Sequence, residues 1–271
     1  MHACLNVDEI VRLIAHELVA FSGEGSAVSL ACSCKSFEDP VLDALWAKQR
    51  SLLLLLKSLP GDVWKEGGCS VSAPTTRVFF SLLKRFIRKS FRRLPTMTEW
   101  VRFRKYARRM RELSRSITPD CQSPEVLSVM QLFTIKEPLL PNLKTLKLWG
   151  IKQYSIPFIP LFLSQRTTSI TLGFESNLPE ATVASMITTL PTLCPDLQAI
   201  YLQNIPRNPM VITAVSRMLL VTNRNTLQEY HGNSLLTEEA SDVLYKLPNL
   251  RVLSVFVGGG GLHYPRHRFQ I

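Results

Sequence analysis

Hydrophobic positions recur along the chain in two different periods. Over residues 7–18, apolar residues fall three, four and seven positions apart, which predicts an amphipathic helix. A second, mostly apolar helix is expected over residues 27–34. A third should begin at Asp39 and Pro40, as N-cap and first helical residue, and run past Trp46 towards Leu56. Residues 1–60 therefore form a three-helix segment.

The second half alternates apolar and polar residues, as strands with one buried face do. The phrase Leu-x-x-Leu-x-Leu follows Pro141-Asn142, and copies of it begin at residues 143, 167, 197, 227 and 250. The fourth copy is imperfect, because Gly232 stands where an apolar residue is expected. Eight inward-facing residues are expected to form one parallel-sheet core: Leu146, Leu148, Ile170, Leu172, Ile200, Leu202, Leu253 and Val255.

Helix-like stretches separate these phrases, at residues 157–163, 179–190, 209–222 and 237–246. A strand followed by a helix, repeated every 24–30 residues or so, is the unit of an α/β solenoid. We therefore expect an α/β fold with parallel strands, a short and irregular solenoid of the leucine-rich-repeat type, over residues 136–257. An ordinary βαβ domain is the alternative.

The net charge of +11 is concentrated in one segment. Between Lys84 and Arg115 there are thirteen basic residues and two acidic ones. Two basic amphipathic helices, separated at Pro95, are expected in a connector over residues 61–135. Phe86, Trp100, Phe103 and Met110 should pack inward. Arg88, Arg92, Arg104 and Arg108 should form a positive face, whose arginines are solvated, paired with acids elsewhere in the chain, or open to phosphates, an anionic membrane or an acidic protein.

Motifs of catalysis and cofactor binding are missing from the sequence. It has no Gly-x-Ser-x-Gly, no phosphate-binding glycine loop and no His-Glu-x-x-His. We therefore expect no enzyme, no catalytic residues, no cofactor and no metal. His263 and His267 have the spacing of ligands on a helix, but Pro265 argues against a helix there. Residues 258–271 are expected to be an irregular or disordered tail.

Targeting signals are not visible either. Charged residues interrupt the apolar pattern of the first twenty positions, and the five leucines at 52–56 are too few to span a membrane. The six cysteines show no zinc-type or Cys-x-x-Cys spacing. An intracellular location, cytoplasmic or nuclear, is expected.

One stretch of the first segment is more specific than its periodicity. The run Leu30-Ala-Cys-Ser-Cys-Lys-Ser-Phe37, followed by Asp39-Pro40-x-Leu42-x-x-Leu45-Trp46, resembles the second half of an F-box. Val7-Asp-Glu-Ile-Val-Arg-Leu-Ile14 is similar to its opening helix, although Asp8 replaces the usual proline. Together with the repeats, the chain resembles fungal F-box proteins with degenerate leucine-rich repeats.

That resemblance implies a non-catalytic adaptor. F-box segments dock on the Skp adaptor of Skp–cullin–F-box ubiquitin ligases, which here implies helix-in-groove binding and, through the Skp adaptor, a cullin ligase. The concave strand face would hold a client protein of unknown identity. The alternative is a protein that binds nucleic acid or an anionic surface through residues 84–115. The anchors expected in the Skp-type contact are Val7, Ile10, Leu30, Phe37, Pro40 and Trp46.

Overall fold

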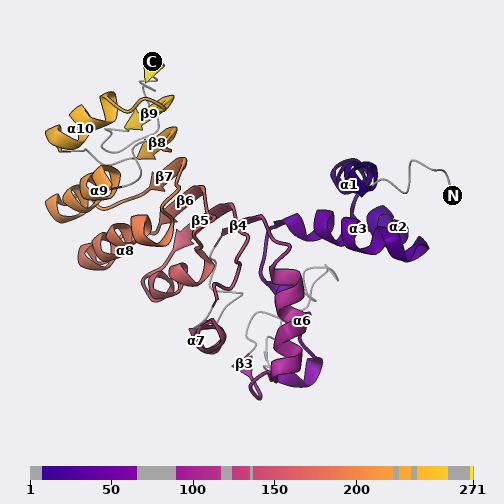
Figure 1. The fold of residues 1–271 in the computed structure, drawn as a ribbon. Coiled ribbons are helices and arrows are strands. Elements are labelled where there is room, and N and C mark those ends of the chain that lie inside the picture. The colour runs from indigo at the N-terminus through magenta and orange to yellow at the C-terminus, as the bar shows by residue number, and fades with distance from the viewer. Residues whose placement is uncertain are drawn as a thin grey trace, which may run out of the picture.

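The structure is a computed structural model. It describes residues 8–65, 90–116, 124–134, 137–221, 226–232, 237–255 and 269–270. Within these ranges the chain is mixed α/β, with helices at its N-terminal end and a sheet in which seven strands run parallel (Figure 1). The expected fold class is confirmed at this level.

The N-terminal helices form a small module with a core of its own. They are α1 (Asp8–Glu17), a π-helical turn (Leu18–Ser22), α2 (Glu24–Ser33) and α3 (Lys35–Ala47). Gly23 allows the turn before α2, because its φ of 82° lies in a region that residues with a Cβ rarely adopt. Small side chains let the helices approach closely. The core consists of Val11, Ala15, Ala27, Phe37, Val41 and Ala44.

The third helix differs from its predicted bounds at both ends. It begins at Lys35, after an extended Cys34, so Pro40 lies inside the helix and not at its start. It ends at Ala47, because Lys48 takes an extended conformation and opens the short strand β1. The leucine run then forms a separate turn of helix, α4 (Leu53–Leu56). Sheet pairing at β1 thus overrides the helical pattern that continues through the sequence.

The main sheet follows the order of the chain. Its strands are β1 (Lys48–Gln49), β4 (Glu112–Ser116), β5 (Thr145–Ile151), β6 (Ser169–Phe174), β7 (Ala199–Gln203), β8 (Glu229–Gly232), β9 (Val252–Val255) and β10 (Phe269–Gln270). Every neighbouring pair from β1 to β9 is parallel, and β10 is antiparallel to β9. The five predicted strands are therefore present, in register with one another.

Helices cover one face of this sheet. They are α7 (Pro124–Phe133), the 3-10 helix η4 (Gln153–Phe162), α8 (Glu180–Leu193), α9 (Pro209–Val221) and α10 (Glu238–Tyr245). Figure 1 shows α8, α9 and α10 stacked on one side of the strands, and α8 packs against both η4 and α9. The four predicted helical stretches are confirmed. The first is 3-10 in character, because Pro157 and Pro160 each lack an amide hydrogen for an α-helical bond.

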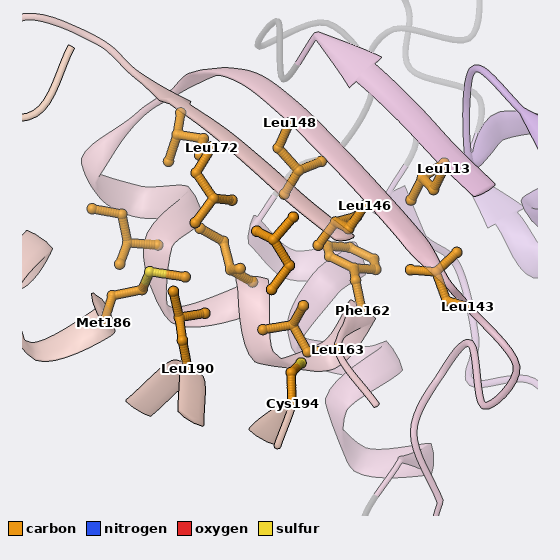
Figure 2. Packing of buried hydrophobic residues seen from close by; sticks show 14 of the residues in the cluster. Leu113, Leu143, Leu146, Leu148, Phe162, Leu163, Leu172, Met186, Leu190 and Cys194 are labelled. Atoms are coloured by element: carbon orange, nitrogen blue, oxygen red, sulfur yellow. The ribbon is translucent and has the colours of Figure 1, made fainter. Parts of the chain in front are cut away.

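The core lies between the strands and these helices. Leu146 and Leu148 from β5 and Leu172 from β6 point towards the helical layer, where they meet Leu163, Met186, Leu190 and Cys194 (Figure 2). Seven of the eight residues predicted for the sheet core are at most 6% exposed. Val255 is half-buried and packs against the same cluster.

The turns that precede the strands are tied to one another by hydrogen bonds. The Lys144 carbonyl accepts from the amides of Thr168 and Ser169, and the Thr168 carbonyl accepts in the same way from the next turn. The Thr167 hydroxyl donates to the Leu143 carbonyl at 3.2 Å. Each turn therefore uses the polar groups of the turn before it, which sets a constant stagger between strands.

The connector contains one of the two predicted basic helices. This helix, α6 (Met97–Ala107), begins with a capping box between Thr96 and Glu99. Trp100 and Phe103 are buried as expected, and so is Met110, just beyond the helix. The chain then enters β4, a strand that lies inside the stretch expected to be helical.

Most of the other predicted helix, including Phe86 and Arg88, lies outside the described residues. Its last part is not helical, because β3 (Ser90–Phe91) pairs antiparallel with β2 (Trp64–Lys65), which follows the 3-10 turn Gly61–Val63. Leu94, just after this pairing, is 56% exposed. The C-terminal tail also contains an ordered pairing, since β10 adds a strand beside β9. Residues 256–268 and 271 lie outside the described ranges, so the expectation of an irregular or disordered tail stays a prediction.

Candidate interaction surfaces

Helix α1 carries apolar residues on two sides. Val11 and Ala15 face the core of the module, whereas Leu13 is 65% exposed and Ile14 is 36% exposed. Ile10 is half-buried and belongs to the exposed side, because residues three and four apart on a helix are neighbours. The apolar surface outside the module's core is therefore larger than the fold of the module requires.

Two more exposed apolar residues follow α1. Phe21, in the π-helical turn, is 85% exposed, and Val28 on α2 is 49% exposed. Scattered apolar residues on a surface need no explanation, but several exposed on one small module make it a candidate contact region. We call Ile10, Leu13, Ile14, Phe21 and Val28 the α1–α2 apolar surface.

The predicted anchors of the module fall into three groups. Ile10 and Leu30 are half-buried and remain partly accessible. Phe37 and Pro40 are buried inside the chain's own fold, and Trp46 packs on Tyr106 with ring centroids 4.8 Å apart. Phe37 and Pro40 therefore pack within the module itself, and their contact with a partner stays a prediction. Val7 lies outside the described residues.

An ion-pair network joins the module to the rest of the fold. Arg12 on α1 bonds to both Asp8 (2.7 Å) and Asp43 (2.8 Å). Arg109, which follows α6, donates to the carboxylates of Asp39 and Asp43 and to the Asp39 carbonyl. The Arg109 side chain is 12% exposed, and its hydrogen bond lowers the pKa of Asp39. This partly buried cation fixes α3 against the start of the sheet.

The other face of the sheet, opposite the helices, carries the polar positions of each phrase, which are half-buried or buried in the described residues. The register places Ser114, Lys147, Thr171, Tyr201, His231 and Ser254 in one row across six strands. We call this surface the open sheet face. The row was within reach of the sequence, because its last five members are the single residue between the two inward positions of each phrase.

Several side chains on the open sheet face are aromatic. Tyr201 stacks on His231, with ring centroids 4.4 Å apart and planes 7° from parallel. Tyr201 also donates a hydrogen bond to Glu229. Burial is the main cause that raises the Tyr201 pKa to about 12, and this hydrogen bond is the second. Trp149 lies over Gly173, where an added Cβ would come within 3.1 Å of the indole. Half-buried tyrosine and tryptophan are residues that dominate many protein–protein contacts.

The predicted positive face of the connector is partly paired with an acidic residue within the described residues. Arg104 and Arg108 share one carboxylate, that of Glu137, at 3.4 and 3.3 Å. Arg104 also donates to the Phe133 carbonyl at 3.2 Å and is only 30% exposed. These two side chains pair with an acidic residue elsewhere in the chain, and a recognition role for the positive face stays a prediction. Arg92 is exposed as expected, and Arg88 lies outside the described ranges.

Ligand chemistry is sparse on the described part of the chain. No group of three or more histidine, cysteine, aspartate or glutamate residues is arranged there to hold a metal ion. Across the same residues, no helix combines the length and the apolar character needed to cross a membrane. A shallow groove of about 450 Å³ lies between α8 and α9, lined by residues such as Ala184, Thr188 and Met210.

Comparison with known proteins does not extend this description. The chain matches no protein-family model, no curated protein and no solved structure. Functional conclusions therefore rest on its own residues and surfaces.

Proposed function

We propose that the chain is a non-catalytic substrate-recognition adaptor of a Skp–cullin–F-box type ubiquitin ligase. In this proposal the N-terminal module binds a Skp-type adaptor, and the open sheet face binds a client protein. A cytoplasmic or nuclear location would follow from that role. The proposal carries over the F-box-like phrases of the sequence, with the partner contact moved from Phe37 and Pro40 to the α1–α2 apolar surface.

The observation that carries the proposal is the second apolar side of α1. Leu13, Ile14 and Phe21 are exposed and do not belong to the core of the module, so the folding of the module does not account for them. An amphipathic helix that presents such residues fits a hydrophobic groove on a partner. Burial of three side chains of this kind stabilises a complex by several kcal/mol before the costs of association, at roughly 1.5–3 kcal/mol each.

We interpret the sheet and its helices as a short solenoid of the leucine-rich-repeat type. Three observations support this interpretation: strand order equals chain order, one helix follows each of β5, β6, β7 and β8, and successive turns bond in the same way. A solenoid leaves one broad surface free for recognition. The half-buried aromatics of that surface suit a protein client.

The alternative role in binding nucleic acid draws less support from the described residues. Trp100 and Phe103 are buried and stack on each other, so they offer no face to a base. Arg93, Arg104 and Arg108 are engaged by carboxylates of the chain itself.

The test uses the full chain and a purified Skp-type adaptor in isothermal titration calorimetry. Ile14→Glu combined with Phe21→Glu should weaken binding by at least about tenfold, because charges would have to enter an apolar groove. Val101→Glu combined with Leu132→Glu is the matched control, since these residues are also exposed and apolar but lie on α6 and α7. Absence of binding by the folded natural chain at micromolar concentration would refute the proposal. An equal loss in both double variants would show that the α1–α2 apolar surface is not the contact.

A further inference from the structure

Asn142, in the turn before β5, gathers three segments of the chain. Its side-chain amide donates to the Arg108 carbonyl at 2.8 Å. Its backbone carbonyl accepts from Arg111 Nη1 at 3.4 Å, and its Oδ1 accepts from Arg166 Nη1 at 2.6 Å. Two guanidinium groups from different turns therefore contact the oxygens of one neutral residue.

Arg111 and Arg166 differ in their partners from three other arginines of the described fold. Arg12, Arg93 and Arg109 each meet two carboxylates. Neither Arg111 nor Arg166 has a carboxylate partner among the described residues, and both are exposed. Like charges held at one asparagine repel each other, so an anion that contacts both would relieve the repulsion.

A third cation lies at the same edge. Lys144 is exposed, and its backbone amide donates to the Arg111 carbonyl at 2.8 Å, which places the two residues side by side. Lys144 immediately precedes β5, so this edge lies at the start of that strand. We call Arg111, Lys144 and Arg166 the Asn142 edge. A segment that crosses the starts of β4 and β5 would pass beside these residues.

We propose that the Asn142 edge binds an acidic segment of the client protein, rich in aspartate or glutamate. This inference rests on the proposed function, since it names the chemistry of a client. Arginine presents five N–H donors in a planar fork that matches a carboxylate, and each of these two arginines uses one nitrogen on Asn142. The remaining donors and the Lys144 ammonium are available to several carboxylates in succession.

A protein segment suits this surface better than a nucleic acid does. Base stacking needs free aromatic faces. Tyr201 and His231 stand on neighbouring strands with one ring face of each against the other, so those two faces are not free for a base. A polypeptide can place carboxylates at the Asn142 edge and other side chains on the open sheet face at the same time.

The test measures fluorescence anisotropy of the full chain with three labelled probes of equal length: a Glu/Ser peptide, a Gln/Ser peptide and single-stranded RNA. Arg111→Gln combined with Arg166→Gln should weaken binding of the Glu/Ser peptide about tenfold, the loss expected for two charge-assisted contacts. Arg217→Gln combined with Arg251→Gln removes the same charge from exposed positions elsewhere and should change it less than about twofold. Unchanged thermal melting by circular dichroism confirms that each variant is folded.

Equal weakening in both double variants would overturn the inference, because it would mean that only net charge matters. Tighter binding of RNA than of the Glu/Ser peptide, lost with the same arginines, would overturn it in favour of a nucleic-acid surface. The same variants are then titrated with the Skp-type adaptor. Lost peptide binding with unchanged adaptor binding supports the Asn142 edge. Absence of adaptor binding in the natural chain refutes the proposed function while leaving the peptide result to stand alone.

Discussion

Gly232 and Tyr230, two residues apart on β8, test how the imperfect fourth phrase fits the sheet. Gly232 lies in register with Leu202 on β7 and Val255 on β9, where the pattern calls for an apolar side chain. The Tyr230 side chain, which is fully buried, occupies that space. A Cβ added at Gly232 would lie 2.3 Å from the Tyr230 hydroxyl oxygen and 2.8 Å from its Cζ. The large Tyr230 side chain therefore fills the space that two smaller apolar side chains, at positions 230 and 232, would otherwise fill.

Gly232→Ala should consequently destabilise the protein. The backbone of Gly232 does not take the left-handed conformation, so replacing glycine alone would stabilise the fold by roughly 0.4–1 kcal/mol through the unfolded chain. Overpacking against a side chain that cannot move aside costs about 1–3 kcal/mol. The difference leaves a net loss of about 1–2 kcal/mol in the free energy of unfolding.

Repeating Gly232→Ala in a Tyr230→Leu variant shows whether contact with the Tyr230 side chain causes the loss of stability. Tyr230→Leu costs stability by itself because it leaves a cavity, but it removes the atoms that the new methyl group would meet. Gly232→Ala should then be neutral or stabilising, which gives a coupling energy of about 1–3 kcal/mol in a double-mutant cycle. Urea unfolding at constant slope measures each variant. Gly61→Ala is the control, since an added Cβ there meets nothing within 4 Å. Equal effects of Gly232→Ala in both backgrounds would refute the reasoning.

Three further outcomes follow from the same structure. Tyr230→Phe should not reduce stability and can raise it by about 1 kcal/mol in urea unfolding, because the buried hydroxyl has no hydrogen-bond partner among the described residues; a clear loss would reveal a partner. Leu146→Ala and Leu202→Ala should each cost about 2–5 kcal/mol, and a change below about half a kcal/mol would show that these positions are not core. Hydrogen bonds from Arg93, and then from the Thr96 amide, lower the Glu99 pKa from 4.5 to about 2. The stability contributed by Glu99 is therefore present above pH 4.5 and lost as the pH falls towards 2, and Glu99→Gln should flatten thermal stability across that window.

The sheet was predictable where the pattern is local. Each Leu-x-x-Leu-x-Leu phrase places two apolar residues on one side of a strand, and the structure buries them in β5, β6 and β7 as expected. β4 escaped prediction because Leu113 is its only apolar residue, in a stretch rich in arginine that also has helical spacing. Its pairing with β5 supplies what its own sequence lacks. Pairing between segments distant in the chain is not visible in the periodicity of either one.

Local periodicity also failed to show which residues of the candidate surfaces would contact each other in the folded chain. Helical spacing identified apolar residues in the N-terminal module, but it did not tell which of them the module would bury in its own core. Phe37 packs inward, whereas Leu13 does not. The pairing of Arg12 and Arg109 through Asp43, and the contact of Arg111 and Arg166 with Asn142, join residues far apart in the sequence. Such contacts depend on the stagger of strands and turns, which only the folded chain defines.

The connection between the module and the sheet bears directly on the proposed role. An adaptor brings a client near a reactive partner, and its benefit is an increased effective concentration that depends on geometry. Helix α3 runs directly into β1, which is a strand of the main sheet, so no linker separates the two parts. Arg109 adds bonds from the sheet side to Asp39 and Asp43 on that helix, and its side chain is only 12% exposed. A partner held by α1 and a client held on the open sheet face would therefore keep a fixed separation. That property suits a recognition adaptor, and a protein that only bound nucleic acid through its basic segment would have no need of it.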